Sequence, residues 1–527
     1  MNQDRQLAAA GAASVRRPPT VPQRADARAW AGLALLSLPT IMLGLDLTML
    51  HLTLPALAAD LQASSTQALW IMDAYGFLIA GFLITMGTLG DRIGRRKLLL
   101  IGAAAFALAS VAAAFSTSAN MLIAARAALG VAGATLMPST LALISNLFTD
   151  PKQRAVGIGI WATMWGVGSA AGPMVGGLIL EWYWWGAAFL IAVPIVGVLL
   201  ILGPFLLPEY RAPHRERLDL PSVALSLGAM LPIVYGIKLI AKSGYAHQAA
   251  VAVLLGVLCG WVFVRRQRRL ADPLLDLGLF ANRGFRVALL VLLLGLVSVG
   301  GAMLLTAQYL QLVAGYTPSA AGLWMGAAAL AMVVGGVGAP FAARVIRPGL
   351  VVAGALALSA AGYLMLALVD SGGSGVMLAV AALALAYLGN GTIAALGTEL
   401  VVYAAPADKA GSASAMTEMA QDLGISLGIA LLGSVAVAVY RGGMADRVPA
   451  HLPMDVREAL ADSLWAAASV ARELPAGLLE QARGAFVDGL QAAAYFSTVS
   501  VAILAAVAAM TLRSIAPSPP VRAGSAL

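Results

Sequence analysis

The chain has 527 residues, enough for several soluble domains, but hydrophobic residues make up 60% of it and charged residues only 11%. A mean hydropathy of +0.87 leaves too few polar side chains to cover a water-soluble surface. The single cysteine, Cys259, excludes a disulfide scaffold, and the net charge of +8 matters less than its distribution along the chain. The composition therefore predicts a protein embedded in a lipid bilayer.

The N-terminal segment 1–28 is basic and rich in proline and alanine, which predicts a disordered cytoplasmic tail. The apolar run after Trp30 is too long for the core of a signal peptide and lacks a clean small-residue cleavage pattern. We therefore expect an uncleaved first membrane helix. We predict that residues 513–527 form a second cytoplasmic tail.

A membrane-spanning helix needs about 20 mostly apolar residues. Fourteen stretches meet this requirement: 29–57, 66–89, 98–116, 119–147, 154–180, 184–207, 219–241, 248–265, 286–313, 318–343, 349–369, 373–403, 410–438 and 488–512. Hydropathy alone also allows twelve or thirteen helices, because 219–241 and 248–265 are the weakest candidates.

The distribution of basic residues favours fourteen helices. With the N-terminus in the cytoplasm, most of the 33 lysines and arginines fall in cytoplasmic segments, and the short outer loops hold almost none. With one helix fewer in the middle, every later loop would lie on the opposite side of the membrane, and this asymmetry would be lost. The pattern predicts a multi-pass protein with both termini in the cytoplasm. The richness in alanine and glycine suggests a bacterial source, so we expect the bacterial cytoplasmic (inner) membrane.

The outer segment 439–487 is polar enough to lie in water. Residues 454–473 have helical periodicity, with Val456, Leu460 and Leu464 on one side. Pro475 interrupts this pattern, and a second amphipathic stretch runs from 476 to about 488. We predict a short helical hairpin on the outer surface; a weakly helical linker is the alternative.

Ionisable residues inside the predicted spans are the main clue to function, since each costs about 2.5–3.5 kcal/mol at a helix centre. They are Asp46, Asp73, Arg126, Glu399, Glu418 and Asp422. Helix rise places the first three at a similar height in the outer half of the first bundle. A carboxylate beside an arginine there can bind and release a proton; a static ion pair is the alternative.

Glu418 and Asp422 are four residues apart, so they share one face of a helix. Two neighbouring acids repel when both are charged, which suits proton binding or attraction of a cationic substrate. An acid pair at the cytoplasmic interface is the alternative. Glu399 lies near the inner end of its span, where a structural role is equally expected.

Aromatic residues accompany these acids, and an aromatic face beside a carboxylate suits a lipophilic cation. The candidate pocket aromatics are Trp70, Tyr75, Trp161, Trp165 and Tyr309. The alternative is a belt of aromatic residues at the membrane interface, which is favoured for Trp70.

Two glycine-containing motifs stand out. The turn after the second span contains Gly87, Asp91, Arg92, Gly94 and Arg95; a patch for anionic lipids explains its basic residues but not its acid and glycines. The fifth span contains a GxxxGPxxGG string formed by Gly168, Gly172, Pro173, Gly176 and Gly177. Small residues four apart let helices approach closely, and proline kinks a helix.

These motifs resemble those of a known family. GTLGDRIGRRK resembles the signature of the major facilitator superfamily between its second and third helices. LDLTMLHLTLP around Asp46, residues 122–134 with Arg126, and GSAAGPMVGG resemble motifs of its fourteen-helix drug:proton antiporters. WIMDAY and TEMAQDLG resemble the acid-bearing segments of the QacA, SmvA and LfrA group of multidrug exporters. The resemblance covers about residues 30–512.

The resemblance implies an all-α major facilitator fold. A six-helix bundle at 29–207 and another at 286–512 would enclose a central cavity. Two inserted helices would lie in the linker 208–285, and an outer hairpin at 439–487 would join the last two spans.

The resemblance also implies roles for individual residues. Asp46 would be the proton site and Arg126 would assist proton transfer. Asp73 would recognise the cation, and Glu418 and Asp422 would match the acids of the thirteenth helix. The turn with Asp91, Arg92 and Arg95 would be a gating latch. Some relatives carry a further acid in the tenth helix, and 318–343 has none.

We therefore expect proton-coupled export of lipophilic cations, such as quaternary ammonium compounds, dyes and biguanides, by alternating access. We expect no enzymatic activity, no catalytic residues, no metal and no cofactor, because the proton gradient drives transport and no Walker-type loop is present. Expected partners are these cations, protons and membrane lipids, without nucleic acid, and the protein is expected to be a monomer.

Two alternatives remain. The first is a proton-driven exporter of an endogenous metabolite, such as a self-made antibiotic or a lipid. The second is a channel or a membrane-embedded enzyme, which the scattered histidines disfavour; they are His51, His214, His247 and His451.

Overall fold

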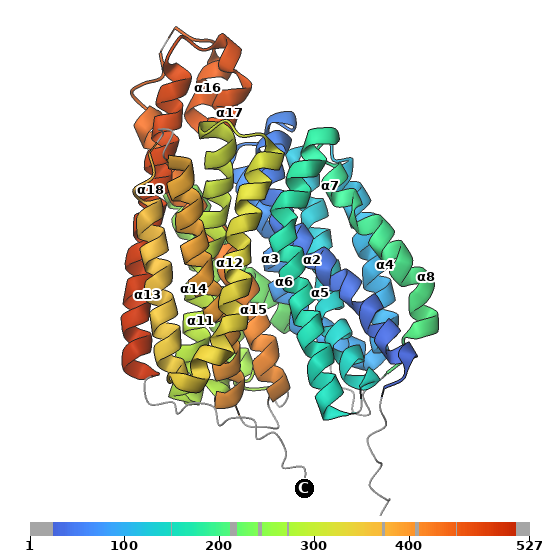
Figure 1. Ribbon diagram of the computed structural model, residues 1–527. Coiled ribbons are helices and arrows are strands. Elements are labelled where there is room, and N and C mark those ends of the chain that lie inside the picture. The colour runs from blue at the N-terminus through green and yellow to red at the C-terminus, as the bar shows by residue number, and fades with distance from the viewer. Residues whose placement is uncertain are drawn as a thin grey trace, which may run out of the picture.

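The computed structural model (Figure 1) describes residues 25–148, 150–210, 219–240, 245–270, 273, 275–370, 375–405, 410–449 and 451–512. For 151, 152, 155, 410–412 and 415 it describes the backbone alone. The described residues form helices and no strands, which confirms the all-α class. The two predicted tails lie outside the described residues, except for 25–28.

Fourteen helices in the described residues are long and apolar enough to cross a membrane, as predicted. They are α2 (Ala27–Asp60), α3 (Ser65–Ile93), α4 (Arg95–Ala114), α5 (Ala119–Leu147), α6 (Pro151–Trp182), α7 (Ala187–Leu190) with α8 (Ala192–Leu206), α9 (Leu220–Ile240), α10 (Ala246–Gln267), α11 (Arg283–Gln308) with the π-helical turn η2 (Tyr309–Val313), α12 (Pro318–Val345), α13 (Pro348–Leu366), α14 (Gly375–Ala404), α15 (Ala410–Met444) and α18 (Leu478–Thr511). A 3₁₀ turn, η1 (Leu277–Ala281), precedes α11.

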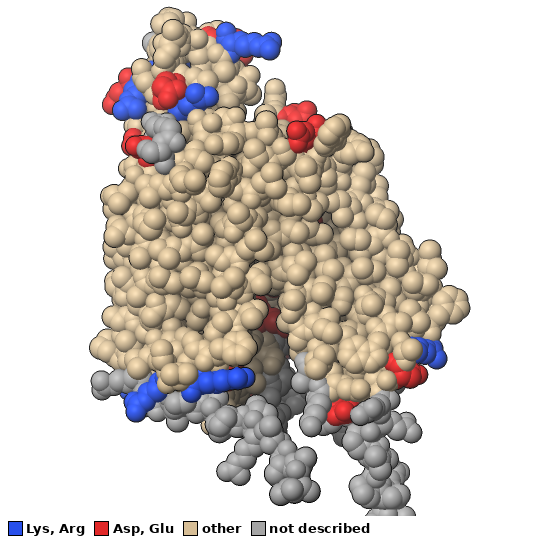
Figure 2. Space-filling model, in the orientation of Figure 1, with Lys and Arg blue, Asp and Glu red and all other residues tan. Residues whose placement is uncertain are grey.

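The helices run alternately up and down between two faces of the molecule (Figure 1). We call the face where α2 begins and α18 ends the termini face. The opposite face, which carries α16 (Met454–Asp462) and α17 (Leu464–Ser469), is the hairpin face. Charged side chains gather at these two ends on the visible side, with an uncharged band between them (Figure 2). This band is the surface expected against lipid.

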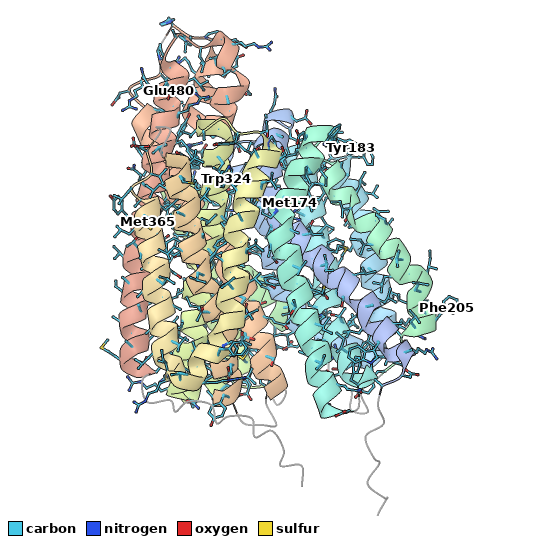
Figure 3. All side chains as sticks on the ribbon, in the orientation of Figure 1. Met174, Tyr183, Phe205, Trp324, Met365 and Glu480 are labelled. Atoms are coloured by element: carbon cyan, nitrogen blue, oxygen red, sulfur yellow. The ribbon has the colours of Figure 1, made fainter. Side chains whose placement is uncertain are left out.

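The spanning helices form two halves, each with its own hydrophobic core. One core is built mainly from α2 to α8, and the other from α11 to α15 with α18. α6 and α12 form one contact between the halves, and α3 and α15 form another. Met174 of α6 and Trp324 of α12 lie on facing helices of the first contact, whereas the exposed Tyr183 and Phe205 point outward (Figure 3).

The inserted helices α9 and α10 pack against each other beside the α3–α15 contact. Phe77 of α3, Val234 of α9 and Ala430 of α15 form one buried cluster, so α9 touches both halves. At the termini face Arg266 lies 2.7 Å from Asp219 and joins the end of α10 to the start of α9. Burial acts to raise the pKa of Asp219, but hydrogen bonds from Arg266 and Ser222 outweigh it and hold the pKa below its ordinary value.

The segment between α15 and α18 is helical, and its predicted apolar face with Val456, Leu460 and Leu464 is buried. Its first arm consists of α16 and α17, followed by a 3₁₀ turn, η4 (Ala471–Glu473). The expected second arm is not a separate helix. After Gly477, whose φ of 83° favours glycine, the chain enters α18 and continues into the membrane span.

Candidate functional site

The glycines of α6 allow close contacts on two sides of the helix. A Cβ at Gly168 would collide with the backbone of Ile41, and one at Gly176 with Met49, both on α2. Gly172 faces Thr48 of α2 in the same way, whereas Gly177 faces the backbone of Pro318 on α12. The motif therefore fits α6 against α2 and also brings the two halves together near the hairpin face.

A cavity of about 400 Å³ lies between the halves on the termini side of this contact. Its wall comes from six helices, α2, α6, α11, α12, α14 and α15, and is largely apolar. The lining residues with distinctive chemistry are His51, Trp165, Ser169, Met303, Met325, Met332 and Tyr387. Methionines adapt to varied shapes and aromatic faces attract cations, so this wall suits apolar and cationic guests.

A buried ion pair lies behind the cavity wall. Nη1 of Arg126 on α5 is 2.8 Å from Oδ2 of Asp46 on α2, and both side chains are almost fully buried. The Nε of Arg126 donates to the Ile71 carbonyl of α3 at 3.1 Å, and the guanidinium lies 4.3 Å from the Tyr75 ring centre. Leu47, next to Asp46, lines the cavity. The pair thus joins three helices directly behind the surface that a guest would touch.

Asp73 does not join this pair, although the sequence places Asp46, Asp73 and Arg126 at a similar height. Its Oδ2 lies 2.7 Å from Nζ of Lys238 on the inserted helix α9, and both side chains are fully buried. The ammonium also lies 3.9 Å from the Trp70 ring centre. A carboxylate and an aromatic face therefore enclose a cation that belongs to the protein itself.

The acids of α15 lie between the cavity and the termini face. Ile425 lines the cavity, and Asp422 and Glu418 follow on the same helix face, one and two turns closer to the termini. Both acids are half-buried. Figure 2 shows acidic atoms inside the opening between the halves. Glu399 is exposed near the termini end of α14 and does not line the cavity.

Of the five predicted pocket aromatics, only Trp165 lines this cavity. Tyr75 packs under Arg126, and Trp70 covers Lys238. Trp161 donates from its indole nitrogen to the Thr140 hydroxyl of α5 at 3.0 Å, and Tyr309 donates to the Asp370 carbonyl at 2.8 Å. None of these four residues lines the cavity, and their contacts are with the helices and ion pairs around it.

The glycine and arginine turn ties together the termini face of the first half. Arg95 forms an ion pair with Asp91 at 2.7 Å, and Nη1 donates to the Pro138 carbonyl of α5 at 3.4 Å. Gly94 has a φ of 114°, which lets the chain turn from α3 into α4. Gly87 also packs near Pro138, whereas Arg92 is exposed. These contacts join α3 to α4 and α5, all of which belong to the first half.

Comparison with known proteins identifies the family. The sequence model described as the Major Facilitator Superfamily matches residues 36–429. The chain belongs to this superfamily. It is a multi-pass membrane transporter.

Two relatives and one solved structure illustrate the similarity. The multidrug efflux pump LfrA of Mycolicibacterium smegmatis is 42% identical, covering 95% of this chain and 99% of that protein. The methyl viologen resistance protein SmvA of Salmonella typhimurium is 35% identical, covering 87% and 93%. A bacterial homologue of the lysosomal transporter Spinster, crystallised inward-facing and unoccupied, has a TM-score of 0.64 at 17% identity, covering 93% and 98%. This structural likeness shows the shared fold.

The structure places three residues at the site that were not site candidates from the sequence: Lys238, Tyr387 and His51, which the sequence analysis names only among the scattered histidines. Lys238 lies close to the end of the predicted span 219–241, where a lysine is expected at the membrane interface. The apolar residues on both sides of it, however, indicate that its side chain could be buried. Tyr387 lies in a uniformly apolar helix that gives no indication which face meets the cavity.

Proposed function

We propose that this transporter exports lipophilic cations by alternating access in exchange for protons. The observation that carries the proposal is the apolar cavity between the halves, reached from the termini face past Glu418 and Asp422. Carboxylates there attract a cation, and the aromatic and methionine wall holds its apolar body. The names of LfrA and SmvA, an efflux pump and a resistance protein, support export rather than uptake.

The direction of export follows from orientation. The short loops of the termini face are rich in arginine, whereas the short loops of the hairpin face hold a single basic residue, Lys242. The positive-inside rule then assigns the termini face to the cytoplasm. The opening past Glu418 and Asp422 faces that side, so a cytoplasmic cation reaches the site directly.

Asp46 is the proposed proton site. Its ion pair with Arg126 links α2 to α5, and α2 also contributes Leu47, Thr48 and His51 to the cavity wall. Protonation neutralises the carboxylate and removes most of the attraction to the guanidinium. The cavity wall is then free to change shape when a proton binds, which couples proton binding to release of the cation.

Transport in proteoliposomes tests the proposal. Ethidium movement driven by an imposed pH gradient should disappear when the gradient is collapsed, and Asp46→Asn should lose this gradient-dependent movement by at least about tenfold. Asp455→Asn, which changes an exposed acid of α16, is the matched control and should transport normally. Ethidium transport that continues at the same rate after the gradient is collapsed would overturn proton coupling. Well-folded protein that moves no cation would instead favour export of an endogenous metabolite.

A further inference from the structure

His51, one of the residues that line the cavity, has a ring nitrogen that is buried and has no hydrogen-bond partner among the described residues. The residue lines the cavity from α2 and is 1% exposed. Its Nδ1 lies 3.1 Å from the Thr48 carbonyl oxygen. A carbonyl can only accept, so Nδ1 carries the hydrogen. Nε2 has no hydrogen-bond partner among the described residues.

The tautomer decides what Nε2 can do. None of the ion pairs in the described part of the chain includes His51 (its ring bonds to the Thr48 carbonyl), and an unpaired buried charge is costly. In the neutral ring with hydrogen on Nδ1, Nε2 is an acceptor. Leaving a buried acceptor without a hydrogen bond costs about 1–3 kcal/mol, so a donor that reaches Nε2 recovers this free energy.

Two further polar groups of the same cavity are also unsatisfied. The hydroxyls of Ser169 on α6 and Tyr387 on α14 are buried without a hydrogen-bond partner in the described residues. With His51 they belong to the cavity lining on three helices, two in the first half and one in the second, and their polar atoms are buried. None of the lining residues is an acid, so a donor inside the cavity depends on neutral acceptors.

We infer that His51 Nε2 accepts a hydrogen bond from an N–H group of the transported cation, assisted by the Tyr387 hydroxyl. His51 thereby favours guanidinium, biguanide and protonated amine cations over quaternary ammonium cations, which have no N–H. This inference rests on the proposed function and adds to it a specificity-determining residue. The acids of α15 attract every cation, and His51 separates one class from the other.

A matched pair of ligands tests the inference. Dodecylguanidinium and dodecyltrimethylammonium share a tail and a single positive charge but differ in N–H groups. Each competes with radiolabelled tetraphenylphosphonium, which also lacks N–H, for binding to reconstituted full-length protein. In His51→Phe the half-maximal concentration of dodecylguanidinium should rise about tenfold, the effect of losing one hydrogen bond to a charged group. That of dodecyltrimethylammonium should change less than about twofold.

Two variants guard against a merely structural effect. His51→Gln keeps an acceptor at this position and should restore much of the guanidinium preference. Tyr387→Phe removes only a hydroxyl and should weaken the same preference in the same direction, even if His51→Phe fails to fold. Equal losses for both competitors, or no loss for either, would overturn the role of His51 while leaving cation export in place. Wild-type protein that binds none of the three cations would overturn the proposed function and this inference together.

Discussion

Buried charges are costly in a membrane, and two buried acids of this transporter each have a basic neighbour. Asp46 has Arg126 and lies beside the cavity wall, whereas Asp73 has Lys238 and lies at the junction with the inserted helix. The first pair has good hydrogen-bond geometry and a further bond to a backbone carbonyl. In the second pair the charged atoms of Asp73 and Lys238 are close together, but neither Asp73 oxygen has a hydrogen bond with acceptable angles. The second pair therefore attaches α9 to α3, whereas Asp46 remains the proposed proton site because its pair lies beside the cavity wall.

Removing one member of the Asp73–Lys238 pair should destabilise the protein strongly. Lys238→Met leaves a carboxylate buried without a counter-charge, which typically costs about 3–5 kcal/mol. Adding Asp73→Asn removes the remaining charge and should recover most of this loss, because a buried ion pair often contributes little net stability. Thermal unfolding of both variants in detergent measures the difference. A double variant as unstable as Lys238→Met alone would contradict this account.

At the scale of single elements, α6 contacts two helices, α2 and α12, and also lines the cavity. Gly168, Gly172 and Gly176 face α2, Gly177 faces α12, and Trp165 faces the cavity. Such contacts need glycine because the neighbouring backbones lie where a Cβ would stand. α6 is therefore placed to transmit movement between the cavity wall and the contact between the halves.

Adding one methyl group at this contact should impair closure. Gly177→Ala places a Cβ against the Pro318 backbone, and overpacking of this kind typically costs about 1–3 kcal/mol. Because the contact lies between the halves, the cost falls on the conformation closed at the hairpin face, and ethidium transport should drop about tenfold. Gly159→Ala on the same helix meets nothing within 4 Å and should transport normally. Equal rates for the two variants would exclude this role for Gly177.

The elements are predictable where one local property decides them. Length and hydropathy determine the spans, and four-residue spacing places Glu418 and Asp422 on one face. The partner of a side chain depends on which helix lies opposite, and no local pattern contains that information. The sequence therefore places Asp73 at a similar height to Arg126 but does not show that Asp73 pairs with Lys238. The sequence also predicts a hairpin arm at the start of α18, because its amphipathic turns precede the apolar ones without a break.

At the scale of the whole molecule, the hairpin face is closed by contacts that cross between the halves. Asp462, at the end of α16, accepts hydrogen bonds from the backbone and hydroxyl of Ser65 at 2.7 and 3.0 Å. It also forms an ion pair with Arg441 of α15. Ser65 begins α3 of the first half and Arg441 belongs to the second, so one carboxylate joins both halves. Trp465 of α17 adds a hydrogen bond to the Ala63 carbonyl at 3.4 Å.

Removing the charge of Asp462 should shift the conformational equilibrium toward opening at the hairpin face. Asp462→Asn keeps the shape but loses the charge, and hydrogen bonds to charged groups contribute about 1.5–3 kcal/mol. If the closed conformation alone makes these contacts, its population relative to the open one should fall roughly tenfold or more. Binding from the termini side should weaken correspondingly, since the cavity between the halves belongs to the closed arrangement.

Spin labels measure this shift directly. Glu181→Cys on α6 and Leu323→Cys on α12 place labels on exposed positions either side of the contact, in a Cys259→Ser background. Asp462→Asn should add a population with a longer label distance, and acidic pH should not be needed to produce it. Asp455→Asn, an exposed acid of α16, controls for lost charge on the hairpin and should leave the distances unchanged. Unchanged distances in Asp462→Asn would mean that the α6–α12 glycine contact holds this face closed without the hairpin, and that the hairpin serves another purpose.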